Sequence, residues 1–206
     1  MTDAFALLGE PRHPWIDPDA LKSRFLPLSA PFHPDRVHGA GDAEREAANQ
    51  RFAELSAAFN TLREPRERLL HLIELEAGAR PRDVQRIPPG TMELFVQIGQ
   101  ACREADEFLS KRTEAPSPML KLKQLQETLD WTDRLDALQK AVNTRQAELV
   151  KELESLNTVW DSAPAVGDPA RPAALPLGRL EELYRAMSYI GRWTEQLSER
   201  FVRFAI

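Results

Sequence analysis

The sequence contains a single cysteine, Cys102, among its 206 residues. One thiol cannot form an internal disulfide, and it cannot by itself build a cysteine-rich zinc or iron–sulfur site. We interpret Cys102 as a buried helix residue rather than a reactive thiol. The sequence therefore gives no reason to expect a bound metal or another cofactor.

Glycine and aromatic residues are also scarce. The chain has 9 glycines and 7% aromatic residues, beside 42% hydrophobic and 29% charged residues. This composition is typical of helical bundles rather than of β-sandwiches or glycine-rich α/β sheets. We predict an all-α fold, with enough apolar residues to bury one large core or two small ones.

Neither an excess of positive charge nor a long apolar run is present. The 32 acidic and 27 basic residues are interleaved and give a net charge of −5, so no broad positive face can neutralise a phosphate backbone. No stretch approaches the ~20 apolar residues that span a bilayer, and the first residues lack the basic start of a signal peptide. We expect no nucleic-acid or membrane partner and a cytoplasmic location.

Motifs that carry catalysis are missing as well. The sequence has no glycine-rich phosphate loop, nucleophile elbow or Cys-His pairing, so we predict that the protein is not an enzyme. His33, Asp35, His38 and Asp42 lie close together, and imidazole and carboxylate both bind zinc. Because these residues lack the regular ligand spacing of known zinc motifs, we predict no metal site.

Helix start and stop signals organise the first part of the chain. Asp3 and Gly9 are suited to begin and end a short helix. Asp17, followed by a proline, starts a second helix, and the interior Pro27 predicts that this helix either ends near Leu26 or kinks. Two further helices are predicted, one capped by Asp42 with the apolar positions Phe52, Leu55, Phe59 and Leu62, and one over residues 65–76.

A break in periodicity divides the chain. Residues 77–90 are rich in proline, glycine and arginine and predict an interdomain linker. We therefore predict one domain over residues 1–76 and a second over residues 91–206.

Three helices are predicted in the second domain. Apolar residues repeat three and four apart over 95–109, over a long stretch from 119 to 160 that could restart near Thr132, and again over 180–204. The prolines between 161 and 178 predict an extended loop. Three helices with apolar seams favour an antiparallel bundle.

One tripeptide, His33-Pro34-Asp35, lies between the second and third predicted helices. By itself it describes a loop in which proline stiffens the turn and aspartate bonds to the backbone. Its surroundings are more specific: Phe-x-Leu-Leu-Gly at 5–9 precedes it, and Ala-Ala-Phe-x-x-Leu at 57–62 follows. This order resembles the J domain, and Leu62-Arg63-x-Pro65-x-x-Arg68 resembles the HscB-type J domain of iron–sulfur assembly.

The second half is similar to the same family by pattern. HscB-like proteins follow the J domain with a three-helix C-terminal domain, and residues 91–206 match that helix count and order. Two stretches, Arg112 to Trp131 and Asp161 to Leu177, look like insertions relative to the usual length of the family.

The resemblance implies a co-chaperone that stimulates ATP hydrolysis by a DnaK/HscA-type chaperone. The tripeptide would be the activating contact, with Asp35 offering a carboxylate to an arginine of the partner. Positive charge near it would aid encounter with an acidic partner surface. The residues implied in chaperone binding are His33, Pro34, Asp35, Arg36, Lys22 and Arg24.

The resemblance also implies that the C-terminal domain presents an IscU-type scaffold protein as client, with Met92 and Phe95 as apolar contacts. Alternatively, Phe95 and Ile98 belong to the bundle core and Met92 packs against the linker. A second hypothesis for the whole chain is a J-like structural interaction protein that no longer activates a chaperone.

Overall fold

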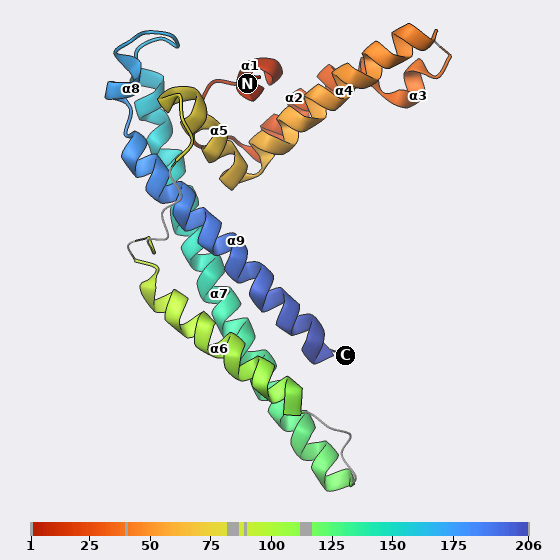
Figure 1. Ribbon diagram of the computed structural model, residues 1–206, viewed down its shortest axis with the longest axis vertical. Helices are drawn as coiled ribbons and strands as arrows, with labels where there is room; N and C mark the ends of the chain where they lie inside the picture. Colours follow the sequence, from red (N-terminus) through yellow and green to blue (C-terminus); the bar gives the residue numbers. More distant parts are fainter. Residues whose placement is uncertain (1, 40, 82–86, 89, 112–116, 206) are drawn as a thin grey trace. The chain divides into compact units, whose positions relative to one another are not determined.

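In the part of the chain that it describes, the computed structural model consists of helices and the segments that connect them, with no strand (Figure 1). The all-α prediction is confirmed. No helix in this part is long and apolar enough to cross a membrane. The described residues are 2–39, 41–81, 87–88, 90–111 and 117–205.

Packing divides the chain into two units that are not consecutive in sequence, because two long helices contribute to both. The sequence predicts two consecutive domains with a linker at 77–90. Residues 82–86 and 89 of that linker lie outside the described residues. The boundary stays a prediction. The first unit combines residues 1–83 with 150–184, and the second combines 84–149 with 185–206.

The first unit begins with α1 (Ala4–Leu8), whose two ends are those predicted. The Asp3 carboxylate accepts the backbone N–H groups of Phe5 and Ala6 at 3.0 and 3.1 Å. These groups have no partner within the first turn of a helix. Gly9 ends the helix at φ 66°, a left-handed conformation that costs glycine little.

The second helix, α2 (Pro18–Ser29), begins as predicted at Asp17, whose carboxylate accepts a first-turn N–H at 2.7 Å. It continues through Pro27, so the first predicted alternative, a stop near Leu26, is wrong, and the kink stays a prediction. Pro27 cannot donate to the carbonyl of Ser23, but both residues are exposed and water can take that bond. The chain then tightens into the 3-10 helix η1 (Ala30–Phe32), which contains Pro31.

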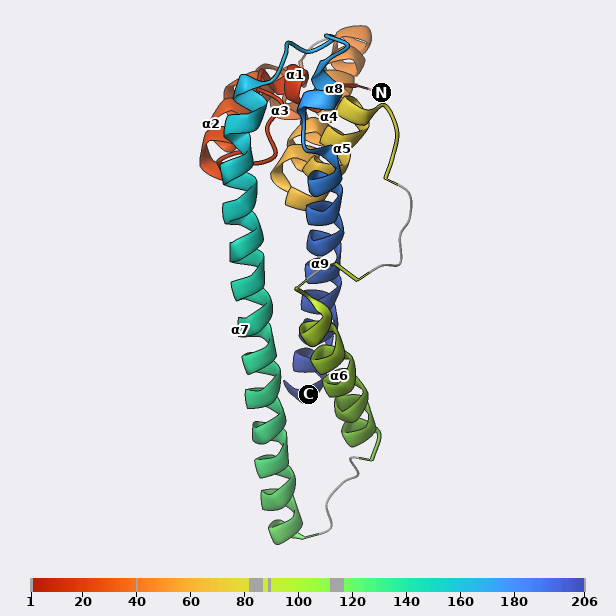
Figure 2. The same cartoon turned by 90° about the vertical axis from the view of Figure 1, so that its left-hand side faces the viewer.

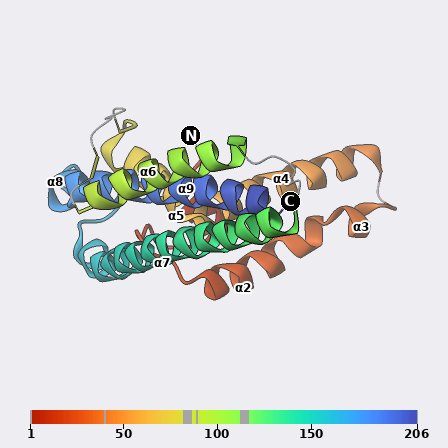
Figure 3. The ribbon, with the colours of Figure 1, turned by 90° about the horizontal axis from the view of Figure 1, so that it is seen from below.

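A helical hairpin follows from α2 and α4 (Asp42–Arg63), with the short α3 (Pro34–Val37) at one end of the pair (Figure 3). The prediction that Asp42 caps α4 is wrong, because Gly41 holds the capping position and Asp42 begins the helix. Its negative charge still suits the positive end of the helix dipole. The Phe25 and Phe59 rings stack across the hairpin at 4.4 Å. The buried side chains of α1, α2 and α4 include Phe5, Leu8, Leu21, Leu55 and Leu62.

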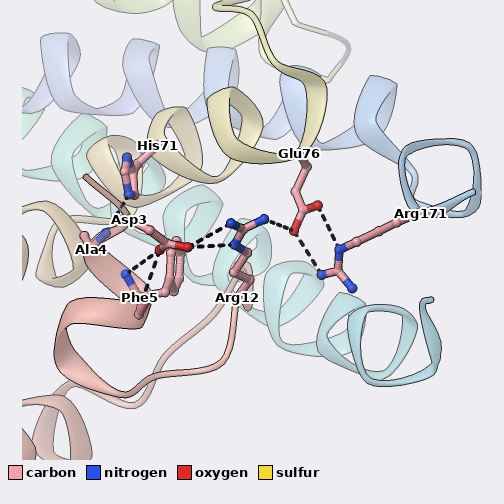
Figure 4. Close-up of polar contacts among 8 residues, drawn as sticks. Asp3, Ala4, Phe5, Arg12, His71, Glu76 and Arg171 are labelled. Carbon is pink, nitrogen blue, oxygen red and sulfur yellow. Dashed lines mark hydrogen bonds and ion pairs between the residues drawn. The ribbon is translucent and has the colours of Figure 1, made fainter. Parts of the chain in front are cut away.

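The helix α5 (Pro65–Ala77) is joined to α1 and to α8 (Arg171–Ala174) by a buried ion-pair cluster (Figure 4). The Glu76 carboxylate accepts two bonds from Arg171, at 2.8 and 2.9 Å. Arg12 lies 3.6 Å from the same carboxylate and also donates to Asp3 at 2.8 Å. Two guanidinium groups and two carboxylates thereby neutralise one another inside the unit.

This cluster overturns the expectation that residues 161–178 form an extended loop. The stretch contains the end of one helix, all of α8 and the start of another, and Arg171 is buried. Its conformation depends on Glu76, 95 residues earlier in the chain, which no local pattern reveals.

In the second unit, α6 (Met92–Lys111) lies beside parts of α7 (Pro118–Ser162) and α9 (Leu177–Ala205), as Figures 1 and 2 show. There α7 runs antiparallel to the other two. The predicted restart near Thr132 is wrong, because its hydroxyl donates to the Thr128 carbonyl at 2.9 Å within one continuous helix. The buried side chains of this unit include Ile98, Ala101, Leu135, Val142, Ile190 and Leu197.

Candidate functional site

The tripeptide forms a capped turn at the end of the hairpin. His33 is the N-cap residue of α3, and its Nδ1 accepts the Asp35 N–H at 3.3 Å. Pro34 occupies the first helical position, where a missing N–H costs nothing. The His33 carbonyl accepts the Arg36 N–H at 2.9 Å, which closes the first turn. Because each residue suits its place in this turn, the loop is ordered by its own sequence.

The His33 ring is held from outside the loop as well. It meets the Phe52 ring of α4 edge-on, with the centroids 5.4 Å apart and an interplanar angle of 87°. About half of the His33 side chain, 49%, is still exposed to solvent. The aromatic contact fixes the orientation of α3 against α4 and leaves the outer edge of the imidazole free for a partner.

Asp35 offers its charge outward. Its side chain is 90% exposed, and His33 Nδ1, at 3.6 Å, is the only basic nitrogen of the described residues within ion-pair distance. Because that nitrogen accepts the Asp35 N–H, a neutral His33 gives no proton to the carboxylate. The carboxylate is therefore available to a cation of a partner. Arg36, next along α3, is also exposed.

The two basic residues predicted on α2 differ in their surroundings. Arg24 donates to the Gly9 carbonyl at 2.6 Å, and its Nε lies 2.8 Å from the Glu10 carboxylate. The charge of Arg24 is thus engaged in joining the end of α1 to α2. Lys22 is exposed. The structure therefore brings together His33, Pro34, Asp35 and Arg36, while Arg24 makes contacts within the fold.

The arginine of the Leu62-to-Arg68 motif has a structural place. Arg68 is buried and donates to the Pro14 carbonyl at 2.9 Å and to the Leu62 carbonyl at 2.5 Å. Burial lowers the pKa of Arg68 to about 10, which leaves it charged at neutral pH. The motif joins α4, α5 and the segment before α2, and so supports the hairpin that carries the loop.

The predicted client-binding residues lie on the surface of α6. Met92 is 55% and Phe95 41% exposed, whereas Ile98 is fully buried. The interpretation of Ile98 as bundle core is confirmed, but Phe95 is not a core residue. The Phe95 ring packs edge-on against Tyr189 at 6.3 Å, and Val96 beside it is exposed. We call Met92, Phe95, Val96 and Tyr189 the α6 patch.

Cys102, by contrast, is buried in α6, as predicted. Burial raises the pKa of its thiol, and the more distant charged groups leave that direction unchanged, so the reactive thiolate is disfavoured. Within the described residues, no group of three His, Cys, Asp or Glu side chains is arranged to hold a metal ion.

Sequence reasoning missed the contacts that support the site. Phe52 is one of the regularly spaced apolar residues of α4. This spacing predicts a buried face, but it does not show that Phe52 contacts His33. The pairing of Arg24 with Glu10 also depends on how α1 packs against α2. The only local signal for this pairing is the acidic Glu10 directly after Gly9, at the end of α1.

A helical hairpin that presents an exposed His-Pro-Asp turn at its end defines a J-type co-chaperone. The chain is 32% identical over 167 residues to the co-chaperone protein HscB homolog of Cupriavidus taiwanensis, which covers 80% of this chain and 82% of that protein. The chain therefore belongs to the HscB family of iron–sulfur cluster assembly co-chaperones, which are not enzymes and which work with Hsp70-type chaperones.

Two solved structures share the fold. The chaperone HscB from Vibrio cholerae matches with a TM-score of 0.60 and 19% identity, over 96% of each chain. Human co-chaperone protein HscB matches with a TM-score of 0.61 and 17% identity, over 98% of this chain and 83% of that one. No protein-family model matches the chain.

Proposed function

We propose that the chain stimulates ATP hydrolysis by a DnaK/HscA-type chaperone through His33, Pro34 and Asp35. The observation that carries this proposal is the ordered and exposed turn. Its backbone is closed by hydrogen bonds from Asp35 and Arg36 to His33, and the Asp35 carboxylate points to solvent without a strong partner. Little conformational entropy is lost when such a loop binds.

The proposed chemistry is recognition rather than bond breaking. Asp35 accepts a charge-assisted hydrogen bond from an arginine of the ATPase, and His33 packs its free edge against the same surface. Lys22 and Arg36 add positive charge that steers encounter. Arg24 has a smaller part in this attraction, because Glu10 already neutralises it.

We also propose that residues 91–206 hold an IscU-type scaffold protein, while residues 1–76 act as the J domain and 77–90 as the linker. The α6 patch supports this assignment, because exposed methionine, phenylalanine and valine side chains on one helix suit an apolar partner surface. Tyr189, which packs against Phe95, extends the same surface.

The activation proposal is tested by the steady-state ATPase rate of the cognate DnaK-type chaperone with the wild-type chain or with His33→Gln. We expect the variant to lose about tenfold or more of the stimulated rate, equivalent to about 1.4 kcal/mol of interaction. His38→Gln is the matched control, because His38 is exposed in the same segment but outside the turn. Equal stimulation by the wild type and His33→Gln would remove the turn from the mechanism.

The client proposal is tested by calorimetric titration of an IscU-type scaffold into the chain. We expect Met92→Ala and Phe95→Ala each to weaken binding by about tenfold, as truncation of a central apolar contact does. Val202→Ala is the control, because Val202 is 60% exposed on α9 in the same unit. If the scaffold binds both patch variants as it binds the control, it docks elsewhere.

One observation favours the second hypothesis, a J-like protein that does not activate a chaperone. With Arg24 engaged by Glu10 and Gly9, α2 presents little free positive charge to an acidic ATPase surface. The same ATPase assay decides between the two functions, since the second predicts no stimulation even by a saturating amount of the wild-type chain.

A further inference from the structure

The first turns of α7 carry a row of exposed apolar side chains in the second unit. Met119, Leu122, Leu125 and Leu129 are between 50 and 83% exposed, although leucine and methionine are usually buried. They are spaced three, three and four residues apart, which places them on one side of a helix. We call these four residues the α7 stripe.

The stripe lies beyond the packed end of the bundle. Phe108 of α6, Trp131 of α7 and Phe204 of α9 form an aromatic cluster with ring centroids 5.9 to 6.3 Å apart. In Figures 1 and 2 the first turns of α7 project past the ends of both neighbouring helices. The stripe therefore precedes the point at which α6 and α9 begin to cover α7.

Nor does the stripe continue the face that α7 turns toward the bundle. The buried residues Leu135, Val142 and Leu149 stand seven apart. Counting back by sevens from Leu135 reaches Thr128 and Lys121 rather than a leucine. The stripe is turned from the buried face by roughly 100°, the rotation of one residue in a helix. The leucines of the α7 stripe are therefore not explained as a continuation of the bundle core.

We propose that the α7 stripe is the interface of a dimer in which two copies of this chain pair their α7 ends in antiparallel fashion. In such a pair centred beside Leu125, Leu122 of one copy lies opposite Leu129 of the other. The two leucine rows then cover each other over residues 122–129, as apolar seams do in coiled coils.

The charges along the segment favour a second copy of the chain as the partner, and they favour antiparallel pairing. The start of the segment carries Lys121 and Lys123, and its end carries Glu127, Asp130 and Asp133. Antiparallel pairing sets Lys121 of one copy against Asp130 of the other, whereas parallel pairing would set like charges together. The antiparallel arrangement also opposes the two helix dipoles.

Side-chain contacts within residues 118–133 do not prevent the pairing of two copies. Lys123 lies 3.8 Å from Glu127, and Gln126 donates to Asp130 at 3.0 Å, all on exposed side chains. Such surface pairs contribute little and can be replaced by contacts with the second copy. The segment is shorter than the roughly 20–30 residues a side of a standard interface, so the dimer is weak and concentration-dependent.

Sedimentation velocity of the full chain over a wide concentration range tests the proposal. We expect a reversible dimer for the wild type and for Val202→Lys, which adds a charge to an exposed position of α9. Leu125→Lys should weaken the dimer by about tenfold or more, because it brings two lysines together at the centre of the pair. A wild type that stays monomeric, or a Leu125→Lys variant that pairs as well as the wild type, would overturn the proposal.

Charge reversal tests the direction with substitutions at three exposed side chains and the half-buried Glu127. Lys121→Glu with Lys123→Glu makes both ends acidic and should weaken the dimer severalfold. Adding Glu127→Lys and Asp130→Lys to the same chain restores opposite ends and should restore pairing. Failure of this restoration contradicts antiparallel pairing. The proposal does not depend on chaperone activation, so its outcome and that of the ATPase assay are separate.

Discussion

At the scale of single residues, the hairpin depends on buried polar groups with one well-placed partner each. His71 of α5 is buried, stacks on Phe5 at 5.8 Å and accepts the Ala4 N–H on Nε2 at 3.0 Å (Figure 4). An imidazole that accepts a backbone N–H on one nitrogen carries its proton on the other and is neutral. Protonation would remove the acceptor and leave the first N–H of α1 without a partner.

This geometry predicts a pH dependence of stability. Burial lowers the pKa of His71 below its usual 6.5, although the carboxylates of Asp3 and Glu74 oppose the shift. Because the folded pKa lies below the unfolded one, the free energy of unfolding is highest above pH 6.5 and falls as the pH drops toward the folded pKa. Urea unfolding at pH 7.5 and pH 5.5 measures this loss. His71→Gln keeps an acceptor without titrating, so its loss should be smaller than that of the wild type and of the control His38→Gln. An equal loss in all three proteins would contradict the assignment.

Three helix caps were predictable because they depend on neighbours in sequence, whereas the cap predicted at Asp42 was wrong by one residue. Asp3, Asp17 and Gly9 act within one turn of their own helix, so residue type and position suffice to predict them. The tripeptide His33-Pro34-Asp35 was predicted only as a loop, because the spacing does not reveal that His33 caps the short helix α3. The pairing of Arg24 with Glu10 and the ring contact between His33 and Phe52 were not predictable, because both depend on the packing of separate helices.

At the scale of helices, the ion-pair cluster around Glu76 joins α8 to α5, which no helix start or stop signal could predict. Arg171 in α8 and Glu76 in α5 are both nearly inaccessible, and two hydrogen bonds join them. The proline-rich stretch before α9 is ordered by this partner rather than by its own helix propensity. The uninterrupted α2 is a similar case, since propensity alone disfavours Pro27 while exposure of the freed carbonyl makes it tolerable.

The cluster predicts a large loss of stability for Glu76→Gln. Removing the carboxylate leaves the buried Arg171 without its counter-charge, while Arg12 keeps Asp3, and an unpaired buried charge typically costs about 3–5 kcal/mol. The control is Glu107→Gln, because Glu107 pairs with Lys111 on the exposed surface of α6 and such pairs contribute under about 1 kcal/mol. Urea denaturation of both variants gives the comparison. If Glu76→Gln is no less stable than the control, the cluster does not hold α8 to α5.

At the scale of the whole molecule, three surfaces have separate tasks. The His33 turn belongs to the first unit and is proposed to meet the ATPase. The α6 patch and the α7 stripe belong to the second unit, and they are proposed to hold a client and a second copy. The turn is ordered without any partner, and both apolar surfaces are presented on regular helices. We therefore expect an adaptor whose three proposed contacts can be removed one at a time without unfolding it.

The central claim is that the His33 turn activates a chaperone, and the ATPase rate of the cognate DnaK-type chaperone, titrated with the full chain, tests it most directly. The account predicts a rate that rises and saturates with the wild type and with His38→Gln, and stays near the basal rate with His33→Gln. A flat titration with folded wild-type chain would contradict it and would favour the J-like protein that does not activate.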